Sequence, residues 1–489
     1  MEIIRKSDDK VIGFLGGWQK ENKNWKYRFN KYVFECDFND VKLLYNCITG
    51  AVGAFSQIEY DLKDNSDHCF YRSWLIENYF LVPDNFNEDD VVDTYRNKAL
   101  TYVSPNYLDK VTAYTIFTTL KCNARCFYCY ELNKKGKKHM TIEIAEKLVQ
   151  YIINHTFEQQ TVRLDWFGGE PLFNQHVIDY ITTRVKGANR RVNAGMISNG
   201  YLFDQETINK ARNSWNLESV QITLDGTEKV YNKTKSYIYK DDLSPFNTVI
   251  SNIHNLIRAG IRVNIRLNID NYNMENMEEL VNYLCKEFEF EKNRGISIYI
   301  FQIFEINGYE RTPEQIKELA NKMIEINHIL NANGFGFFTN DIRSIQTHHC
   351  MIDSNDCVTV DPDGRIGVCE HHYDKWLFSS LDKPDEVNLD SIKHWQTKVD
   401  QNNDMCNNCK LKPACLKVPN CPSFRICRGE EKKYQYDRIS LGLIQMYNTY
   451  MTNLNNPNCN GNCCNLNDCN VNDMSKPIIK CKCNCESNR

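Results

Sequence analysis

From about residue 111 onward the sequence alternates strand-like and helix-like segments, and this alternation limits the possible folds more than any other feature. The expected strands cover residues 112–120, 162–167, 192–198, 219–225, 261–269 and 296–304. The expected helices cover residues 141–155, 174–187, 204–215, 247–260, 274–288 and 312–334. Six consecutive βα units predict an α/β fold in which right-handed crossovers build a parallel sheet or a partial (β/α)6 barrel.

Polar motifs follow the expected strands where such folds place their active sites. The motifs that end or follow the first five strands contain Cys122, then Gly168-Gly169-Glu170-Pro171, then Ser198-Asn199-Gly200, then Asp225-Gly226, and finally Arg266, Asn268 and Asp270. Each motif alone is a weak signal, because a two-glycine turn after a strand is usually only a turn. Their shared placement at the carboxyl ends of parallel strands predicts a functional site at that edge.

Composition and charge narrow the compartment and the partners. The net charge of −4 disfavours a nucleic-acid partner. The sequence contains no run of 18 apolar residues, so no membrane span is predicted, and its first residues do not resemble a secretory signal. We therefore expect a cytoplasmic protein. The 22 cysteines are many for that compartment, where disulfides are disfavoured. Clustered cysteines are therefore interpreted first as metal or redox sites.

The first cysteine group has the spacing C-x3-C-x2-C at Cys122, Cys126 and Cys129. A zinc or iron–sulfur site closed by protein needs four ligands. Three thiolates within eight residues would leave one metal position open for a small molecule. The alternatives are a zinc site completed by a distant residue, or reduced loop cysteines.

The second cysteine group lies between residues 350 and 427 and contains eight cysteines, enough for two complete four-cysteine sites. Its members are Cys350, Cys357, Cys369, Cys406, Cys409, Cys415, Cys421 and Cys427. The segment 361–369 predicts a hairpin with a Pro-Asp-Gly turn, and 406–409 predicts the tight loop of C-x2-C chelation. Two zinc ribbons are the alternative interpretation.

The first cysteine group, with Tyr128 before its last cysteine, resembles that of the radical S-adenosylmethionine (SAM) enzymes. The resemblance covers about residues 112–430 and implies a [4Fe–4S] cluster that binds SAM and cleaves it to a hydrogen-abstracting 5′-deoxyadenosyl radical. It implies that Gly168, Gly169 and Glu170 bind the SAM amino group and that Ser198 contacts its methionine part. The TLDG segment at 223–226 resembles another SAM-binding stretch. The resemblance to the family also implies cofactor-binding roles for Tyr128, Asp225, Lys235, Arg266 and Asn268. Lys235 occupies a position where relatives have an arginine.

The second group resembles the SPASM extension of radical SAM peptide maturases, which holds two auxiliary [4Fe–4S] clusters. The resemblance implies one cluster on Cys350, Cys357, Cys369 and Cys421, and a second on Cys406, Cys409, Cys415 and Cys427. This chain has Cys415-x5-Cys421 where the family has C-x3-C. Glu370 follows Cys369, at a position where an acidic residue takes a proton from the substrate in sulfatase-maturing relatives; a solvent-facing glutamate is the alternative.

Four regions are expected. Residues 1–110 loosely resemble the winged-helix element that binds leader peptides, with a simple N-terminal cap for the barrel as the alternative. Residues 111–335 would form the radical SAM barrel and 336–452 the SPASM domain. Residues 453–489, rich in Asn and Cys, are expected to be disordered, with metal binding or a substrate-like role as alternatives.

Together these features predict a radical SAM maturase that cross-links a ribosomally made precursor peptide carrying a leader, most favourably through a cysteine thioether. Its cofactors would be three [4Fe–4S] clusters and SAM, and its electron donor a flavodoxin or ferredoxin. Neither nucleic acid nor membrane is an expected partner. The alternatives are a formylglycine-forming sulfatase maturase and, outside enzymes, a zinc-stabilised peptide-binding module.

Overall fold

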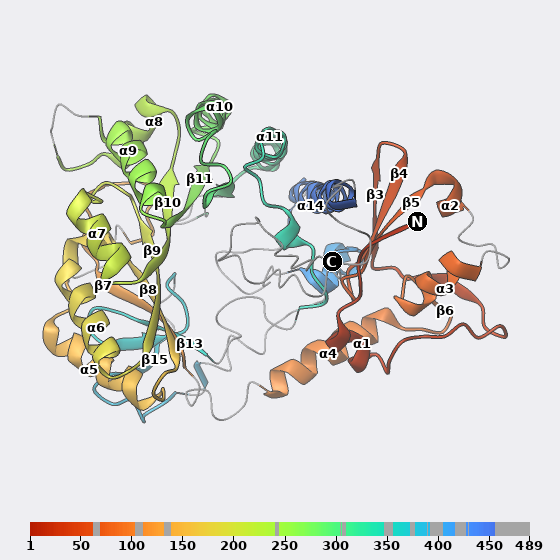
Figure 1. Ribbon diagram of the computed structural model, residues 1–489, viewed down its shortest axis with the longest axis horizontal. Coiled ribbons are helices and arrows are strands. Elements are labelled where there is room, and N and C mark those ends of the chain that lie inside the picture. Colours follow the sequence, from red (N-terminus) through yellow and green to blue (C-terminus); the bar gives the residue numbers. More distant parts are fainter. Residues whose placement is uncertain are drawn as a thin grey trace, which may run out of the picture.

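The computed structural model describes residues 1–61, 69–102, 111–131, 138–239, 244–303, 305, 310–346, 356–371, 377–388, 390–391, 404–415, 427–428 and 430–454. A large parallel sheet covered by helices lies at one side of Figure 1, and a smaller N-terminal sheet lies at the other, with the long helix α14 beside it. No helix in these ranges is both long enough and apolar enough to cross a membrane.

The large sheet confirms the six expected parallel strands. They are β7 (Ala113–Thr119), β8 (Thr161–Gly168), β9 (Arg191–Ser198), β10 (Leu217–Leu224), β11 (Arg262–Ile269) and β12 (Ile296–Gln302). They lie in sequence order across the sheet, and each pairs in parallel with the next. This order places all six carboxyl ends, and the motifs that follow the first five, at one edge.

Helices bury one face of this sheet. They are α5 (Ile142–Asn154), α6 (Gln175–Gly187), α7 (Gln205–Asn213), α8 (Glu228–Lys235), α9 (Pro245–Arg258), α10 (Met277–Glu287) and α11 (Pro313–Ala332), with short 3-10 turns at Pro171–Asn174 and Met274–Asn276. Strand β8 shows how the side chains alternate between the two faces of the sheet. Every second residue, Val162, Leu164 and Trp166, is buried in the apolar core between the sheet and the helices. The side chain of Thr141 caps α5, accepting from the Ile144 amide at 3.3 Å.

The face opposite the helices, called the inner face here, carries the alternate and more polar side chains. Thr223, Arg266 and Tyr299 are register partners on β10, β11 and β12, as are Gln221, Asn264 and Ser297 one step earlier. Hydrogen bonds join Tyr299 Oη to Gln221 Oε1 and Ser297 Oγ to Asn264 Oδ1, each at 2.6 Å. A polar inner face next to the carboxyl edge can receive a polar substrate.

Of the described helices that the sequence does not predict, two lie after residue 110 and have at least eight residues. The first is α8, which occupies 228–235 in the segment between the expected strand 219–225 and the expected helix 247–260. Its apolar pattern is weak because Val230 and Tyr231 are its only large apolar residues. The second is α14 (Glu431–Leu454), whose last two residues enter the segment expected to be a disordered tail. The rest of that segment, 455–489, lies outside the described residues.

The expected hairpin at 361–369 is confirmed and extends the large sheet. β13 (Cys357–Val360) pairs in parallel with β7, and β14 (Arg365–Gly367) and β15 (Leu377–Ser380) continue the sheet in antiparallel order. Gly364 closes the turn with φ +78°, a left-handed conformation that glycine adopts without strain. The first half of the second cysteine group is thereby attached directly to the parallel sheet.

The N-terminal region contains the paired strands that its sequence suggests. Its elements are β1 (Glu2–Arg5), α1 (Asp9–Phe14), β2 (Tyr27–Phe29), β3 (Val33–Phe38), β4 (Val41–Asn46), β5 (Val52–Ser56), α2 (Gln57–Asp61), α3 (Cys69–Glu77), β6 (Leu81–Pro83) and α4 (Glu88–Tyr102). The four-stranded sheet has the order β1-β5-β4-β3, and β2 pairs with β6. Helix α3 is followed directly by β6, while the winged-helix comparison stays a prediction.

Helix α14 joins the N-terminal region to the rest of the chain. Its buried residues Ile439 and Leu443 share one apolar cluster with Leu43 and Tyr45 of β4 and with Leu411, which lies just after Cys409. Arg438 of α14 pairs with Asp341 in the short turn Thr339–Asp341. The second half of the second cysteine group includes α13 (Asp404–Asn407) and the turn Lys412–Ala414. Leu411 and Ala414 in this segment share the apolar cluster with residues of the N-terminal sheet and of α14.

Candidate functional site

The cysteines of the first group lie in the loop directly after β7, at the carboxyl edge of the sheet. Cys122, Cys126 and Cys129 are all half-buried and form no disulfide. Burial raises the pKa of Cys122 to about 12 and that of Cys129 to about 11. A bound metal reverses this effect, because a coordinating thiol loses its proton outright.

The two-glycine turn after β8 is fastened to the backbone that leads into the cysteine loop. The amide of Gly169 donates to Thr119 O and the amide of Glu170 donates to Lys121 O, both at 2.9 Å. A Cβ on Gly168 would lie 2.1 Å from Thr119 O, so this close approach requires glycine. The motif therefore sets the cysteine loop at a fixed position relative to Glu170.

Glu170 is fully buried and forms the centre of a small polar cluster. It accepts hydrogen bonds from Ser198 Oγ at 2.9 and 3.1 Å and from the Asn199 amide at 2.9 Å. Burial raises the pKa of Glu170 to about 7 despite these bonds. Asn199 Nδ2 in turn donates to Asn123 Oδ1 at 2.6 Å, which links the cluster to the residue after Cys122.

A second buried network joins the cysteine loop to β10 and β11. Tyr128 donates to Asp225 Oδ1 at 2.6 Å, Lys235 Nζ lies 2.9 Å from Asp225 Oδ2, and Asn268 Nδ2 donates to both Tyr128 (3.0 Å) and Asp225 (3.1 Å). Burial alone would lower the pKa of Lys235, but the charge of Asp225 raises it well above its ordinary value. Asn273, which sequence reasoning missed, supports the Asp225 carbonyl at 2.7 Å.

Arg266 extends this network onto the inner face. Its Nε donates to Asn268 Oδ1 at 2.9 Å, and its guanidinium stacks on Phe301 with 3.6 Å between Cζ and the ring centroid. Burial lowers the pKa of Arg266. Stacking on Phe301 fixes the planar guanidinium without occupying its remaining donors.

Glu370 reaches the same region from the hairpin. Burial and the charge of Asp165 raise the pKa of the Glu370 carboxyl, whereas the charge of Arg266 lowers it. Asp165 and Arg266 therefore both lie close enough to Glu370 to interact with its charge. Among the described residues, its buried Oε2 has no hydrogen-bond partner. The neighbouring Tyr130 ring contacts the His371 ring at 4.4 Å, which holds the cysteine loop against the hairpin. At least one oxygen of the Glu370 carboxyl is therefore withdrawn from solvent.

The second cysteine group is only partly described. Cys357 begins β13, Cys369 is buried after β14, and the Cys409 amide donates to Cys406 O at 3.1 Å, which confirms the tight loop between the latter two. Cys415 and Cys427 are half-buried. Cys350 and Cys421 lie outside the described residues, so neither expected ligand set is tested as a whole.

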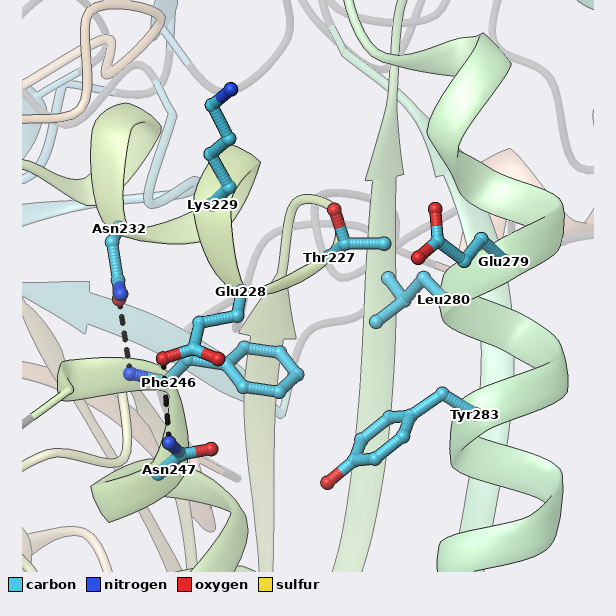
Figure 2. Close-up of a pocket in the computed structure, with 9 residues that line it drawn as sticks. All are labelled: Thr227, Glu228, Lys229, Asn232, Phe246, Asn247, Glu279, Leu280 and Tyr283. Carbon is cyan, nitrogen blue, oxygen red and sulfur yellow. Dashed lines mark hydrogen bonds between the residues drawn. The ribbon is translucent and has the colours of Figure 1, made fainter.

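A surface groove of about 560 Å³ lies apart from the cysteines, on the outer side of the sheet between α8, α9 and α10 (Figure 2). Its lining is mixed, with Glu228 and Glu279 beside Phe246, Leu280 and Tyr283. None of its lining residues belongs to the site predicted from the sequence.

Comparison with protein families decides the nature of this domain. Residues 116–284 match the model of the radical SAM superfamily. These residues form a radical SAM domain. They include Cys122, Glu170, Ser198, Asp225 and Asn268, so the cysteine loop and both buried networks lie inside the matched region, whereas Phe301 and Glu370 lie beyond it.

Relatives of this radical SAM domain cover different shares of the chain. An uncharacterised protein of Methanocaldococcus jannaschii is 23% identical over 291 residues, which are 56% of this chain and 90% of that protein. The radical SAM cyclopropyl synthase TigE of Paramaledivibacter caminithermalis is 23% identical over 283 residues, and the match spans 49% of this chain and 59% of TigE. The solved structure of native anSMEcpe with bound AdoMet superposes with a TM-score of 0.52 at 15% identity, covering 70% of this chain and 99% of anSMEcpe. The similarity to anSMEcpe shows that the two proteins share a fold.

A radical SAM domain implies a [4Fe–4S] cluster and SAM, and the residues present fit both. Three thiols lie in one loop beside the buried carboxyl of Glu170, and the Ala124 amide donates to Cys122 Sγ at 3.3 Å, as backbone amides do to cluster sulfurs. In the described part of the chain, no three His, Cys, Asp or Glu side chains converge as ligands of a single ion. A [4Fe–4S] cluster does not need such convergence, because each cysteine binds a different iron atom.

Proposed function

We propose that this protein is a radical SAM peptide maturase that abstracts a hydrogen atom from a ribosomally made precursor peptide and forms a cross-link, most favourably a cysteine thioether. One observation carries the proposal. The three-cysteine loop is fastened to the buried Glu170–Ser198 pair, and this arrangement lies within the matched domain and opens onto a polar inner face.

The residues at the carboxyl edge would hold the cofactors. Cys122, Cys126 and Cys129 would bind three irons of the cluster, and Glu170 with Ser198 would bind the polar end of SAM. Bound together, the cluster and SAM supply one-electron cleavage that yields a hydrogen-abstracting radical. The contribution of the protein is to fix these groups in a water-poor site, which the full burial of Glu170 supports.

The Asp225 network would set the position of the bound SAM. Tyr128 contacts Asp225 from the cysteine loop, while Lys235 and Asn268 contact it from α8 and β11. Because the carboxylate of Asp225 contacts Lys235, Tyr128 and Asn268, it is held in one orientation. Lys235 in turn is occupied by Asp225, so Arg266 is the better candidate for contact with an external carboxylate.

The inner face would receive the peptide, with Glu370 as the group that takes a proton from the reacting side chain. Its buried Oε2 has no protein partner among the described residues, and its raised pKa favours proton uptake. Formation of a thioether from a cysteine and a C–H bond breaks the C–H and S–H bonds and forms one C–S bond. One hydrogen leaves as an atom to the 5′-deoxyadenosyl radical and the other as the thiol proton, and the one remaining electron would pass to an auxiliary cluster of the second cysteine group. Glu370 is the described carboxylate best placed for the second.

A peptide substrate is also supported by a structural neighbour. The solved structure of native anSMEcpe with bound AdoMet and Kp18Cys peptide superposes on this chain with a TM-score of 0.52 at 16% identity. The second cysteine group would hold two auxiliary clusters, and the N-terminal sheet would bind the leader of the precursor along an edge strand. A small flavodoxin or ferredoxin would supply the electrons, in the cytoplasm.

Isotope transfer tests the proposal directly. The reconstituted enzyme is incubated with SAM, a reductant and the precursor peptide encoded beside its gene, made with deuterated side chains. We expect deuterium in 5′-deoxyadenosine and a peptide that has lost two hydrogens, with the loss resistant to thiol reductant. An aldehyde at the modified residue would instead identify a formylglycine-forming enzyme, and 5′-deoxyadenosine without deuterium in the presence of peptide would contradict a peptide substrate.

A further inference from the structure

An exposed aromatic pair covers the outer side of the cysteine loop. Phe127 stands between Cys126 and Cys129 and is 59% exposed, and Tyr272, in the loop after β11, is 42% exposed. Their ring centroids are 4.9 Å apart with the planes at 77°. Apolar surface that stays exposed to water is unfavourable, and adjoining exposed apolar side chains are typical of an interaction surface.

The pair also touches the interior of the site. The Phe127 ring lies 5.5 Å from the Tyr128 ring, and Tyr128 donates to the buried Asp225. Phe127 thus faces solvent while the next residue in the loop faces inward. Ile238, which is 47% exposed, lies beside the same loop because its amide donates to Asn123 O at 2.8 Å. Three exposed apolar side chains therefore surround the outer side of the cluster loop.

The charge around this surface differs from that of the whole chain. The described part of the cysteine loop carries two exposed basic side chains, Lys121 and Arg125, whereas the chain as a whole has a net charge of −4. Lys121 and Arg125 are exposed, and no carboxylate of the described residues forms an ion pair with either of them. Arg125 instead donates to the carbonyls of Cys122 and Ala124, at 2.7 and 2.8 Å. A basic surface in an acidic protein favours an acidic partner through electrostatic steering.

We propose that Phe127, Tyr272 and Ile238, with Lys121 and Arg125, form the docking surface for a small acidic one-electron carrier protein. The proposal rests on the proposed function, which requires one electron for each SAM cleaved. In the docked complex one electron leaves the reduced carrier and enters the group held by Cys122, Cys126 and Cys129. The carrier is oxidised by one electron, and no proton or bond is exchanged. Small, weak interfaces are typical of such electron-transfer encounters.

The test measures binding of reduced flavodoxin, as the probe, to the reconstituted full-length enzyme by isothermal titration calorimetry at several salt concentrations. We expect Phe127→Ala and Tyr272→Ala each to weaken binding about tenfold, a loss usual for an aromatic residue at the centre of an interface. Affinity should fall as salt rises. Phe290→Ala is the matched control, because Phe290 is 84% exposed and lies just before β12, at the opposite edge of the sheet. It should bind flavodoxin like the wild type.

A chemical reductant separates this proposal from the proposed function. With dithionite in place of flavodoxin, Tyr272→Ala and Phe290→Ala should form 5′-deoxyadenosine as fast as the wild type. Unchanged flavodoxin affinity in both Phe127→Ala and Tyr272→Ala would overturn the docking surface, as would failure of the wild type to bind flavodoxin. Failure of dithionite to support any SAM cleavage would instead contradict the proposed function, while the binding comparison would still stand.

Discussion

Lys235 Nζ lies 2.9 Å from Asp225 Oδ2, and both side chains are withdrawn from solvent. The pair joins the end of α8 to the end of β10 and holds the carboxylate to which Tyr128 donates. A buried pair of this kind contributes more to geometry than to net stability, because desolvation of the two charges offsets their attraction. Loss of one partner, however, leaves the other charge buried and uncompensated.

We therefore expect Lys235→Met to lower the free energy of unfolding of the metal-free protein by about 3 kcal/mol, within the range usual for breaking a buried pair. The measurement is urea unfolding followed by circular dichroism. Lys233→Met, at an exposed position two residues earlier on α8, should change little. Equal stability of the two variants would show that Asp225 does not depend on Lys235.

The raised pKa of Glu170 predicts a pH dependence of stability. Burial raises this pKa to about 7, above the value of an unfolded glutamate, so the stabilising protonated form is fully present at low pH. Stability relative to Glu170→Gln should then fall as the pH rises from about 4.5 to 7 and become constant above that range. Thermal unfolding at several pH values measures the difference.

Glu370 should matter for the product and not for SAM cleavage. If it takes the substrate proton, Glu370→Gln should reduce peptide cross-linking by at least about a hundredfold, a usual contribution of general-base catalysis. Formation of 5′-deoxyadenosine in the absence of peptide should remain near the wild-type rate. Mass spectrometry of the peptide and chromatography of the nucleoside measure the two effects separately. Equal loss of both would indicate a structural role for Glu370.

The shared core around α14 predicts that the N-terminal region and the cysteine-rich region unfold together. Leu443 is fully buried in the cluster that contains residues of β4 and Leu411, so Leu443→Ala should cost about 3 kcal/mol. Leu454→Ala, at the exposed end of the same helix, should cost little. Calorimetry should show one shifted transition for both regions; a transition of the N-terminal region that does not move would contradict this coupling.

The sequence was most informative where a periodic pattern and a motif coincided. The sequence predicts all six parallel strands and the hairpin at 361–369, because alternation and turn residues report local backbone preferences. The sequence predicts that Glu170 and Ser198 lie near each other only because the strands that precede them are expected to be neighbours in the sheet. The distances themselves required the structure.

Other features left little local signal. Helix α8 buries few large side chains, so its sequence has no clear apolar stripe, and α14 is stabilised by distant contacts such as that between Arg438 and Asp341. Asn273, which supports Asp225, belongs to no motif. The contact of Phe127 with Tyr272 joins loops 145 residues apart, a separation at which sequence patterns carry no information about contact.

The most direct test of the central claim compares the wild type with a variant in which Cys122, Cys126 and Cys129 are all replaced by Ala. Both proteins are purified and reconstituted without oxygen, and iron content and 5′-deoxyadenosine formation from SAM under a strong reductant are measured. We expect about twelve irons and SAM cleavage in the wild type, and about eight irons without cleavage in the variant, as one cluster lost from three requires. Cleavage that persists in the variant, or a colourless wild type that binds zinc in place of iron, would contradict the account.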